Sequence, residues 1–149
     1  MGEVCRAAVE EAGSAHPERT MELSTAGDLR GTFDHDRVFQ AIANLLGNAI
    51  QHGEDPIRVA VWEADDHGSV VTRVTNRGRV IPPEQLPKLF DPFTHAGDEK
   101  KGNLGLGLFI VAQIARAHGA TYDVSSSEVE TAFNIRWPRA LRSETPDRP

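Results

Sequence analysis

The sequence predicts an α/β two-layer sandwich, in which one mixed β-sheet is covered on a single face by about three helices. Apolar residues repeat with helical spacing in separate segments, and shorter segments between them alternate apolar with polar residues, as strands do. The elements follow the order helix, strands, helix, hairpin, short helix, loop, helix, hairpin. Because a doubly wound parallel sheet requires regular alternation of strands and helices, this order favours a mixed sheet.

The N-terminal region combines one helix with extended segments. Residues 4–12 have helical spacing, and Gly13 ends this helix. Residues 20–24 alternate like a strand, and residues 28–33 are expected to form a second short extended piece. We therefore assign residues 1–22 to an N-terminal helix and a lead-in strand.

A long amphipathic helix is predicted at residues 36–52. Asp34 is a suitable N-cap, because its carboxylate can accept a hydrogen bond from a backbone N–H of the first turn. The apolar residues of this segment recur at steps of three and four and form one buried stripe: Val38, Phe39, Ile42, Leu45, Leu46 and Ala49. The stripe predicts that this helix packs on the sheet.

The second half of the chain predicts two further helices and two hairpins. Two prolines open a short helix at residues 82–89. A second amphipathic helix follows Gly105 and Gly107 and runs to about His118, which caps it, and Gly119 supplies a left-handed C-cap. Strands are expected at residues 57–63, 70–75, 122–126 and 132–137.

Length and composition exclude several functional classes. The 149 residues fit one compact domain, and the last of them, 139–149, are predicted to be a flexible tail. With 16 basic and 22 acidic residues the net charge is −6, which disfavours nucleic acid and direct membrane contact. Cys5 is the only cysteine, so neither an internal disulfide nor a zinc cluster is expected. These features are typical of a cytoplasmic domain.

Two asparagines on the long helix are candidate metal or phosphate ligands. Asn44 and Asn48 are four residues apart, so they project from the same side of the helix, with Gln51 nearby. Asparagine is a mediocre helix former, so a pair in mid-helix requires an explanation. One interpretation is a pair of structural amides bonded to neighbouring backbone. The other is a carboxamide oxygen bound to Mg²⁺, which prefers hard oxygen ligands.

Glycines gather at the start of the later amphipathic helix. Gly102, Gly105 and Gly107 leave backbone N–H groups free to approach a phosphate at the positive end of the helix dipole. An ordinary flexible loop is the alternative interpretation. The spacing fits neither a P-loop nor a dinucleotide-binding βαβ unit.

Two other segments carry candidate ligand-binding residues. Asn76 and Gly78 follow a strand, where an amide oxygen can accept a hydrogen bond from the amine of adenine; a simple Asn-x-Gly turn is the alternative. Phe90 and Phe93 flank a helix stop that can also serve as a hinge. The neighbouring lysine pair at 100–101 can reach phosphates or can simply be solvated.

Taken together and in this order, four segments resemble the ATP-binding boxes of the histidine kinase catalytic domain: NLLGNAIQHG, VTNRGRVIP, LFDPF and GNLGLGLFI. This family belongs to the GHKL superfamily, with gyrase B, HSP90 and MutL. The resemblance covers residues 23–138 as one ATP-binding catalytic domain. It implies the Bergerat fold and, as cofactors, ATP and Mg²⁺.

The resemblance also implies specific roles. Asn48 corresponds to the metal ligand, and Asn44 and Asn48 together to the catalytic positions; Asn76 falls where the family reads adenine. The nucleotide-binding residues that it implies are Asn44, Asn48, Gln51, His52, Asn76, Gly78, Ile81, Phe93, Lys100, Lys101, Gly102, Leu104, Gly105, Leu106, Gly107 and Leu108.

Three positions depart from the family pattern. Asn76 replaces the usual aspartate, and a neutral acceptor makes a weaker hydrogen bond than a charged one. Val80 replaces the second glycine of that box, and Gln51 stands where many kinases carry a lysine. We therefore expect nucleotide binding that is retained but weakened.

The implied activity is transfer of the ATP γ-phosphate to a histidine on a dimerisation and phosphoacceptor domain. None of the six histidines has the sequence setting of that acceptor. The expected partners are therefore the phosphotransfer domain of a parent kinase and, indirectly, a response regulator. The parent is expected to be either a soluble sensor or a membrane-bound sensor that has this domain in the cytoplasm.

Three alternatives remain open at this point. An ATP-hydrolysing clamp of the gyrase kind carries a glutamate base where Asn44 stands, and an amide cannot accept that proton. A serine kinase acting on sigma-factor regulators shares the same fold. A degenerate nucleotide-binding or docking module is the third alternative.

Overall fold

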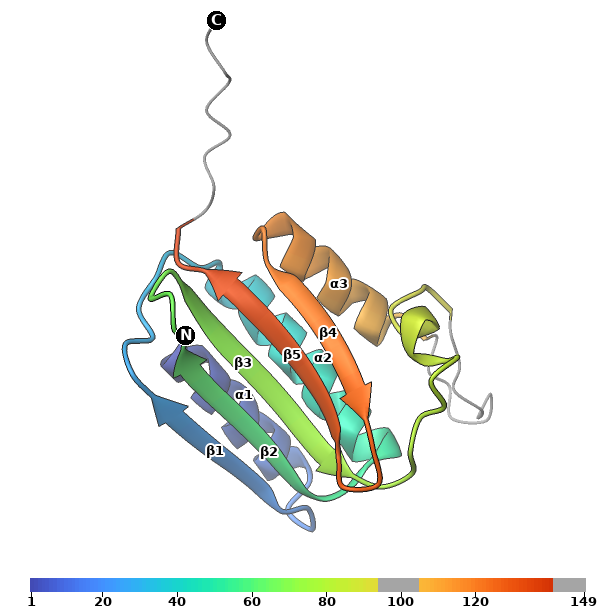
Figure 1. The fold of residues 1–149 in the computed structure, drawn as a ribbon. Helices are drawn as coiled ribbons and strands as arrows, with labels where there is room; N and C mark the ends of the chain where they lie inside the picture. Colours follow the sequence, from blue (N-terminus) through green and yellow to red (C-terminus); the bar gives the residue numbers. More distant parts are fainter. Residues whose placement is uncertain (94–104, 141–149) are drawn as a thin grey trace, which may run out of the picture.

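The computed structural model describes residues 1–93 and 105–140. Three helices, α1 (Gly2–Ala15), α2 (His35–His52) and α3 (Gly107–Ala117), form one layer behind a five-stranded sheet (Figure 1). The strands are β1 (Met21–Ala26), β2 (Glu54–Glu63), β3 (Ser69–Arg77), β4 (Thr121–Ser126) and β5 (Thr131–Pro138). The predicted two-layer sandwich is confirmed. None of the helices in these ranges has both the length and the apolar composition of a membrane-spanning helix.

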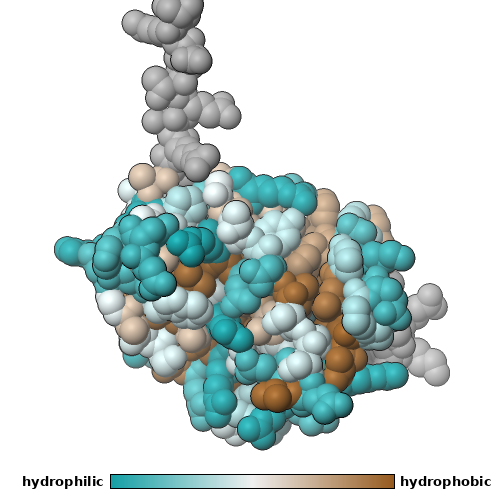
Figure 2. Space-filling model, in the orientation of Figure 1, coloured by the Kyte–Doolittle hydropathy of each residue, from teal (hydrophilic) through white to brown (hydrophobic). Residues whose placement is uncertain are grey.

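The sheet is mixed, as predicted. Its strand order is β1-β2-β3-β5-β4; β1 runs parallel to β2, and the other neighbours are antiparallel. Successive side chains along each strand point to opposite faces of the sheet. Two paired positions that point towards the helices are Val59 with Val74 and Thr72 with Ile135. The other face is uncovered, and in Figure 2 it is largely hydrophilic, with a hydrophobic strip beside β4 on the side facing the short helix η1 (Leu86–Lys88).

Helix α2 forms the centre of the buried layer. It begins where predicted, because the Asp34 carboxylate accepts a hydrogen bond from the backbone N–H of Arg37 at 3.2 Å. Its apolar side is completely enclosed between the sheet and the other two helices; the buried members are Val38, Ala41, Ile42, Leu45, Leu46 and Ala49. This packing fixes the rotation of α2 and leaves its amide side towards α3.

A cluster of aromatic and polar side chains joins the start of α2 to the end of α3. His118 is buried and, as predicted, caps α3, with its ring Nδ1 2.9 Å from the carbonyl oxygen of Ile114. The ring Nε2 accepts a hydrogen bond from the backbone N–H of Asp34 at 3.3 Å. The ring also meets the buried indole of Trp137 edge to face at 5.3 Å. The relative position of α2 and α3 is therefore fixed at this end.

The prediction of a second extended piece at residues 28–33 is wrong, since no strand forms there. Its backbone groups are satisfied by Arg139 instead of by a neighbouring strand. The guanidinium donates to the carbonyl oxygens of Asp28 and Arg30, and the backbone N–H of Thr32 donates to the carbonyl of Arg139 at 2.7 Å. A long-range side chain thus replaced the sheet ladder that the local pattern favoured.

The short helix predicted at residues 82–89 is reduced to η1, a single 3-10 turn. Pro87 lies inside this segment and lacks the N–H that a longer α-helix requires. The segment is nevertheless anchored, because the Phe90 ring packs against Tyr122 at 4.7 Å and against Phe133 at 6.1 Å. This anchor holds the start of the following loop against the sheet.

Cys5 provides a probe of the packing of α1. The thiol is fully buried, and burial raises its pKa from 9.0 to about 12. We expect a disulfide reagent such as DTNB to leave the folded chain unmodified at pH 8 and to react as urea unfolds it. Because the unfolded thiol ionises first, stability should fall as pH rises between these two pKa values. Rapid labelling of the folded chain would contradict this packing.

Candidate functional site

The amide side of α2 faces the beginning of α3. Asn44 and Asn48 are both half-buried, and the Nδ2 of Asn44 donates a hydrogen bond to the carbonyl oxygen of Gly107 at 3.3 Å. Asn48 lies one helical turn further along the same side. The structure therefore brings the predicted amide pair and the predicted glycine-lined helix start together.

The N-terminus of α3 presents backbone N–H groups that have no partner within the helix. Leu106 is its N-cap and makes no side-chain capping hydrogen bond. The first intrahelical bond runs from the N–H of Ile110 to the carbonyl of Leu106, so the preceding N–H groups have no partner within the helix. A Cβ added at Gly107 would meet nothing within 4 Å. Gly105, Leu106, Gly107 and Leu108 are half-buried around this opening, which suits an anionic group.

The ends of the loop before α3 are joined by one backbone hydrogen bond. The N–H of Phe93 donates to the carbonyl oxygen of Gly105 at 3.2 Å. Both residues have positive φ, 61° and 67°, and the side chain of Phe93 is 66% exposed. The predicted ligands Lys100, Lys101, Gly102 and Leu104 lie outside the described residues.

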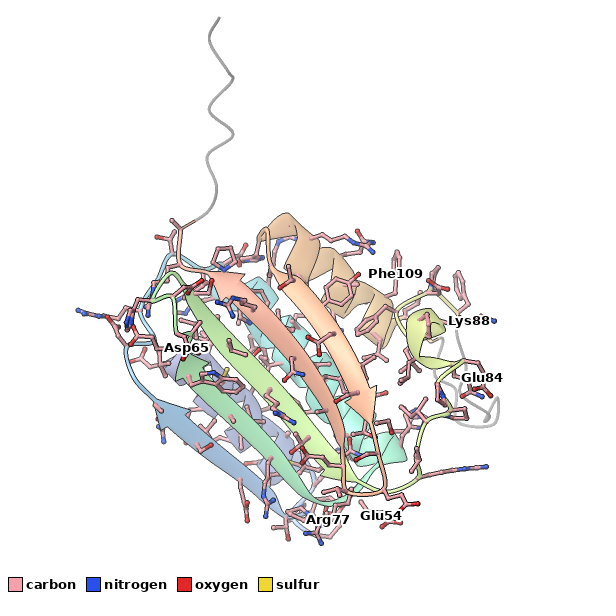
Figure 3. The ribbon with its side chains drawn as sticks, in the orientation of Figure 1. Glu54, Asp65, Arg77, Glu84, Lys88 and Phe109 are labelled. Atoms are coloured by element: carbon pink, nitrogen blue, oxygen red, sulfur yellow. The ribbon has the colours of Figure 1, made fainter. Side chains whose placement is uncertain are left out.

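A second part of the site lies at the end of β3. Asn76 is buried with 8% of its surface exposed, and its Nδ2 donates to the carbonyl oxygen of Arg77 at 2.7 Å. This bond leaves the carboxamide oxygen as the acceptor for another group. Gly78 has φ 128°, a conformation that side-chain-bearing residues rarely adopt. Figure 3 shows the adjacent pair Glu54 and Arg77 at this end of the sheet.

The structure adds neighbours that the sequence did not single out. Thr131, the first residue of β5, is paired with Asn76 of β3 and is also buried. Its hydroxyl lies 2.7 Å from that of Ser126, which accepts a hydrogen bond from the backbone N–H of Ile81 at 2.9 Å. Ile81 is thereby held at the end of β4. The sequence signal for this pair was the presence of hydroxyl residues, Ser126 and Thr131, at the ends of the last two predicted strands. Only the strand register shows that their hydroxyls meet.

The two parts are connected through the C-terminal turn of α2. Gln51 is half-buried and His52 exposed, and both belong to this turn. The next residue, Gly53, lies against Asn76: a Cβ added there would be 2.3 Å from Asn76 Nδ2. Among the described residues, the predicted ligands thus follow one path from α3, along α2, to the end of β3. Their individual roles in binding stay predictions.

Comparisons with known proteins agree with this arrangement. The family model described as "Histidine kinase-, DNA gyrase B-, and HSP90-like ATPase" matches residues 33–141. The signal transduction histidine-protein kinase AfsQ2 of Streptomyces coelicolor is 34% identical over 122 residues, which cover 80% of this chain and 22% of that protein. The bacteriophytochrome of Pseudomonas aeruginosa is 32% identical over 141 residues, 93% of this chain and 19% of that protein.

A solved structure matches over nearly its whole length. The catalytic domain of histidine kinase ThkA superposes with a TM-score of 0.81 and 26% identity, covering 95% of this chain and 93% of that one. By contrast, the chain spans only about a fifth of the length of the two curated relatives. From the matched residues, the chain belongs to the family of histidine kinase-, DNA gyrase B- and HSP90-like ATPases.

Proposed function

We propose that this chain is the ATP·Mg²⁺-binding catalytic domain of a two-component sensor histidine kinase. In this role it transfers the ATP γ-phosphate to a histidine on the dimerisation domain of its parent kinase, in the cytoplasm, and a response regulator then receives the phosphate. The observation that carries the proposal is the contact of Asn44 with Gly107, which places the amide side of α2 at the uncapped start of α3.

The residues present fit a magnesium nucleotide. Asn48 offers a carboxamide oxygen of the kind that Mg²⁺ accepts, and the first N–H groups of α3, which have no partner within the helix, offer donors for phosphate oxygens. Asn76 offers an acceptor for the adenine amine, two residues before Gly78. Bound Mg²⁺ would neutralise phosphate charge during phosphoryl transfer. The chain itself binds and orients the nucleotide, and this positioning supplies most of the catalysis.

The position of Asn44 favours a kinase over an ATP-hydrolysing clamp. A clamp needs a general base for water at this place, whereas the amide of Asn44 donates its hydrogen bond to a backbone carbonyl. The neutral Asn76 and Gln51 favour binding that is weaker than in relatives with charged residues at these positions. A binding module without kinase activity is therefore the second candidate.

Titration with a non-hydrolysable ATP analogue, with and without Mg²⁺, tests the proposal. We expect saturable binding by calorimetry that is tighter with Mg²⁺. With ATP and the dimerisation domain of the parent kinase added, we expect a phosphorylated histidine whose phosphate is lost in acid. Binding without transfer would support the binding module, and an acid-stable phosphoserine on a regulator would support the serine kinase. Absence of binding would refute the proposal.

A further inference from the structure

Arg19, in the turn between α1 and β1, holds the C-terminal end of α2. Its Nη1 donates to the carbonyl oxygen of Ile50 at 2.6 Å, and its Nη2 donates to that of Gly53 at 2.9 Å. The last carbonyls of a helix have no partner within the helix, so Arg19 supplies the donors that this end lacks. Its side chain is only 17% exposed, which limits competition from water.

Asp55 fixes the orientation of the guanidinium. Its carboxylate accepts from Arg19 Nε at 2.8 Å through one oxygen and from the backbone N–H of Thr20 at 3.0 Å through the other. Two hydrogen bonds lower the pKa of Asp55: the larger effect comes from the backbone N–H of Thr20 and the next from the Arg19 side chain. The carboxylate is therefore charged at neutral pH. Arg19 therefore donates from all three guanidinium nitrogens, and an ammonium group, whose donors share one nitrogen, cannot reproduce this planar spread of donors.

Gly53, whose carbonyl Arg19 holds, is wedged between the two candidate adenine-binding residues. On one side, a Cβ added to Gly53 would overlap the side-chain amide of Asn76. On the other, the Gly53 Cα lies 3.6 Å from the place that a Cβ would take at Gly78. In such close packing, a shift of Gly53 displaces its neighbours. Figure 1 shows the α1–β1 turn, the α2–β2 connection and the end of β3 together at the lower end of the sheet.

We propose that Arg19 is a positioning residue for the purine end of the nucleotide site, acting through Gly53 on Asn76 and Gly78. The inference rests on the proposed function, because it assigns the purine to Asn76. Within residues 1–93 and 105–140, Arg19 bonds to the backbone behind the site and to Asp55, and so it sets where the acceptor oxygen of Asn76 lies.

The substitutions Arg19→Lys and Arg58→Lys form a matched pair. Arg58 of β2 also makes a 2.8 Å ion pair, with its register partner Glu22 of β1, but on the exposed face of the sheet. We expect Arg19→Lys to lower the affinity for Mg·ADP about tenfold, since two charge-assisted hydrogen bonds are lost. Affinity for magnesium tripolyphosphate, which has no purine, should not change. Arg58→Lys should alter neither affinity.

A second measurement requires no nucleotide. In ¹H–¹⁵N spectra of the free chain, Arg19→Lys should shift the side-chain amide signals of Asn76, and Arg58→Lys should not. Asp55→Asn is a milder variant that weakens the acceptor for Arg19 Nε and the Thr20 N–H but keeps both carbonyl contacts of Arg19, and its effects should have the same sign. Equal loss of ADP and tripolyphosphate affinity, or unchanged ADP affinity in both Arg19→Lys and Asp55→Asn, would overturn the proposal.

The two proposals fail in different ways. If the unmodified chain bound neither ADP nor tripolyphosphate, the proposed function would be wrong, while the Asn76 signals would still report whether Arg19 positions that side chain. If the unmodified chain bound both ligands and the Asn76 signals stayed in place in Arg19→Lys, the positioning role alone would be wrong.

Discussion

Asn48→Ala should abolish the magnesium dependence of nucleotide binding. The substitution removes the carboxamide oxygen that we assign to Mg²⁺, and alanine favours the helix, so α2 should remain folded. We expect the affinity for Mg·ATP analogue to fall on the order of a hundredfold. In excess EDTA, the variant and the unmodified chain should bind the analogue equally. Calorimetric titrations under both conditions provide the measurement.

Asn134→Ala is the matched control for this experiment. Asn134 lies on the uncovered face of the sheet, where its amide donates to Asp123 at 2.9 Å. Its replacement should leave both titrations as they are in the unmodified chain. Magnesium dependence that survives in Asn48→Ala would show that the metal ligand is another residue.

Gly53→Ala should both destabilise the chain and impair nucleotide binding. The added Cβ would lie 2.3 Å from Asn76 Nδ2 and 2.7 Å from the carbonyl oxygen of Ala49, so side chain and helix end must both move. Overpacking of this kind costs about 1–3 kcal/mol of unfolding free energy. Because Asn76 is displaced, ADP affinity should fall as well. Urea unfolding and ADP titration measure the two effects.

Gly47→Ala provides the contrasting glycine on the same helix. Gly47 is exposed in the middle of α2, and a Cβ there would meet nothing within 4 Å. Alanine should stabilise the chain by about 0.5–1 kcal/mol, since glycine is a poor helix former. ADP affinity should stay the same. If Gly53→Ala were as stable as Gly47→Ala and bound ADP equally well, the close packing at Asn76 would be wrong.

Local pattern was sufficient to predict most elements of this fold. Helix α2 and its Asp34 cap follow from spacing and from one side chain, and both are local properties. Strand order is not local: that β1 lies parallel to β2 at an edge depends on contacts between segments far apart in sequence. The same reason explains the error at residues 28–33, where Arg139, more than a hundred residues later, satisfies the backbone.

The residues of the candidate site also divide into those that local sequence pattern predicts and those that depend on tertiary contacts. Asn44, Asn48 and Gly107 were predicted from residue type and spacing, and the structure adds the contact between Asn44 and Gly107. Thr131, Gly53 and Arg19 were not singled out, because the contacts that bring each of them to the proposed site exist only in the tertiary structure. Glycine after a helix is so common as a stop signal that its packing against Asn76 leaves no distinct trace in the sequence.

Arg139 has a consequence for where this folding unit ends. Strand β5 finishes at Pro138, but Arg139 joins three separate stretches of backbone: the carbonyls of Asp28, Arg30 and His67 all accept from its guanidinium. A chain cut after the last strand would lose every one of these donors. Arg139 is therefore held in the packed structure although it follows the last residue of the sheet.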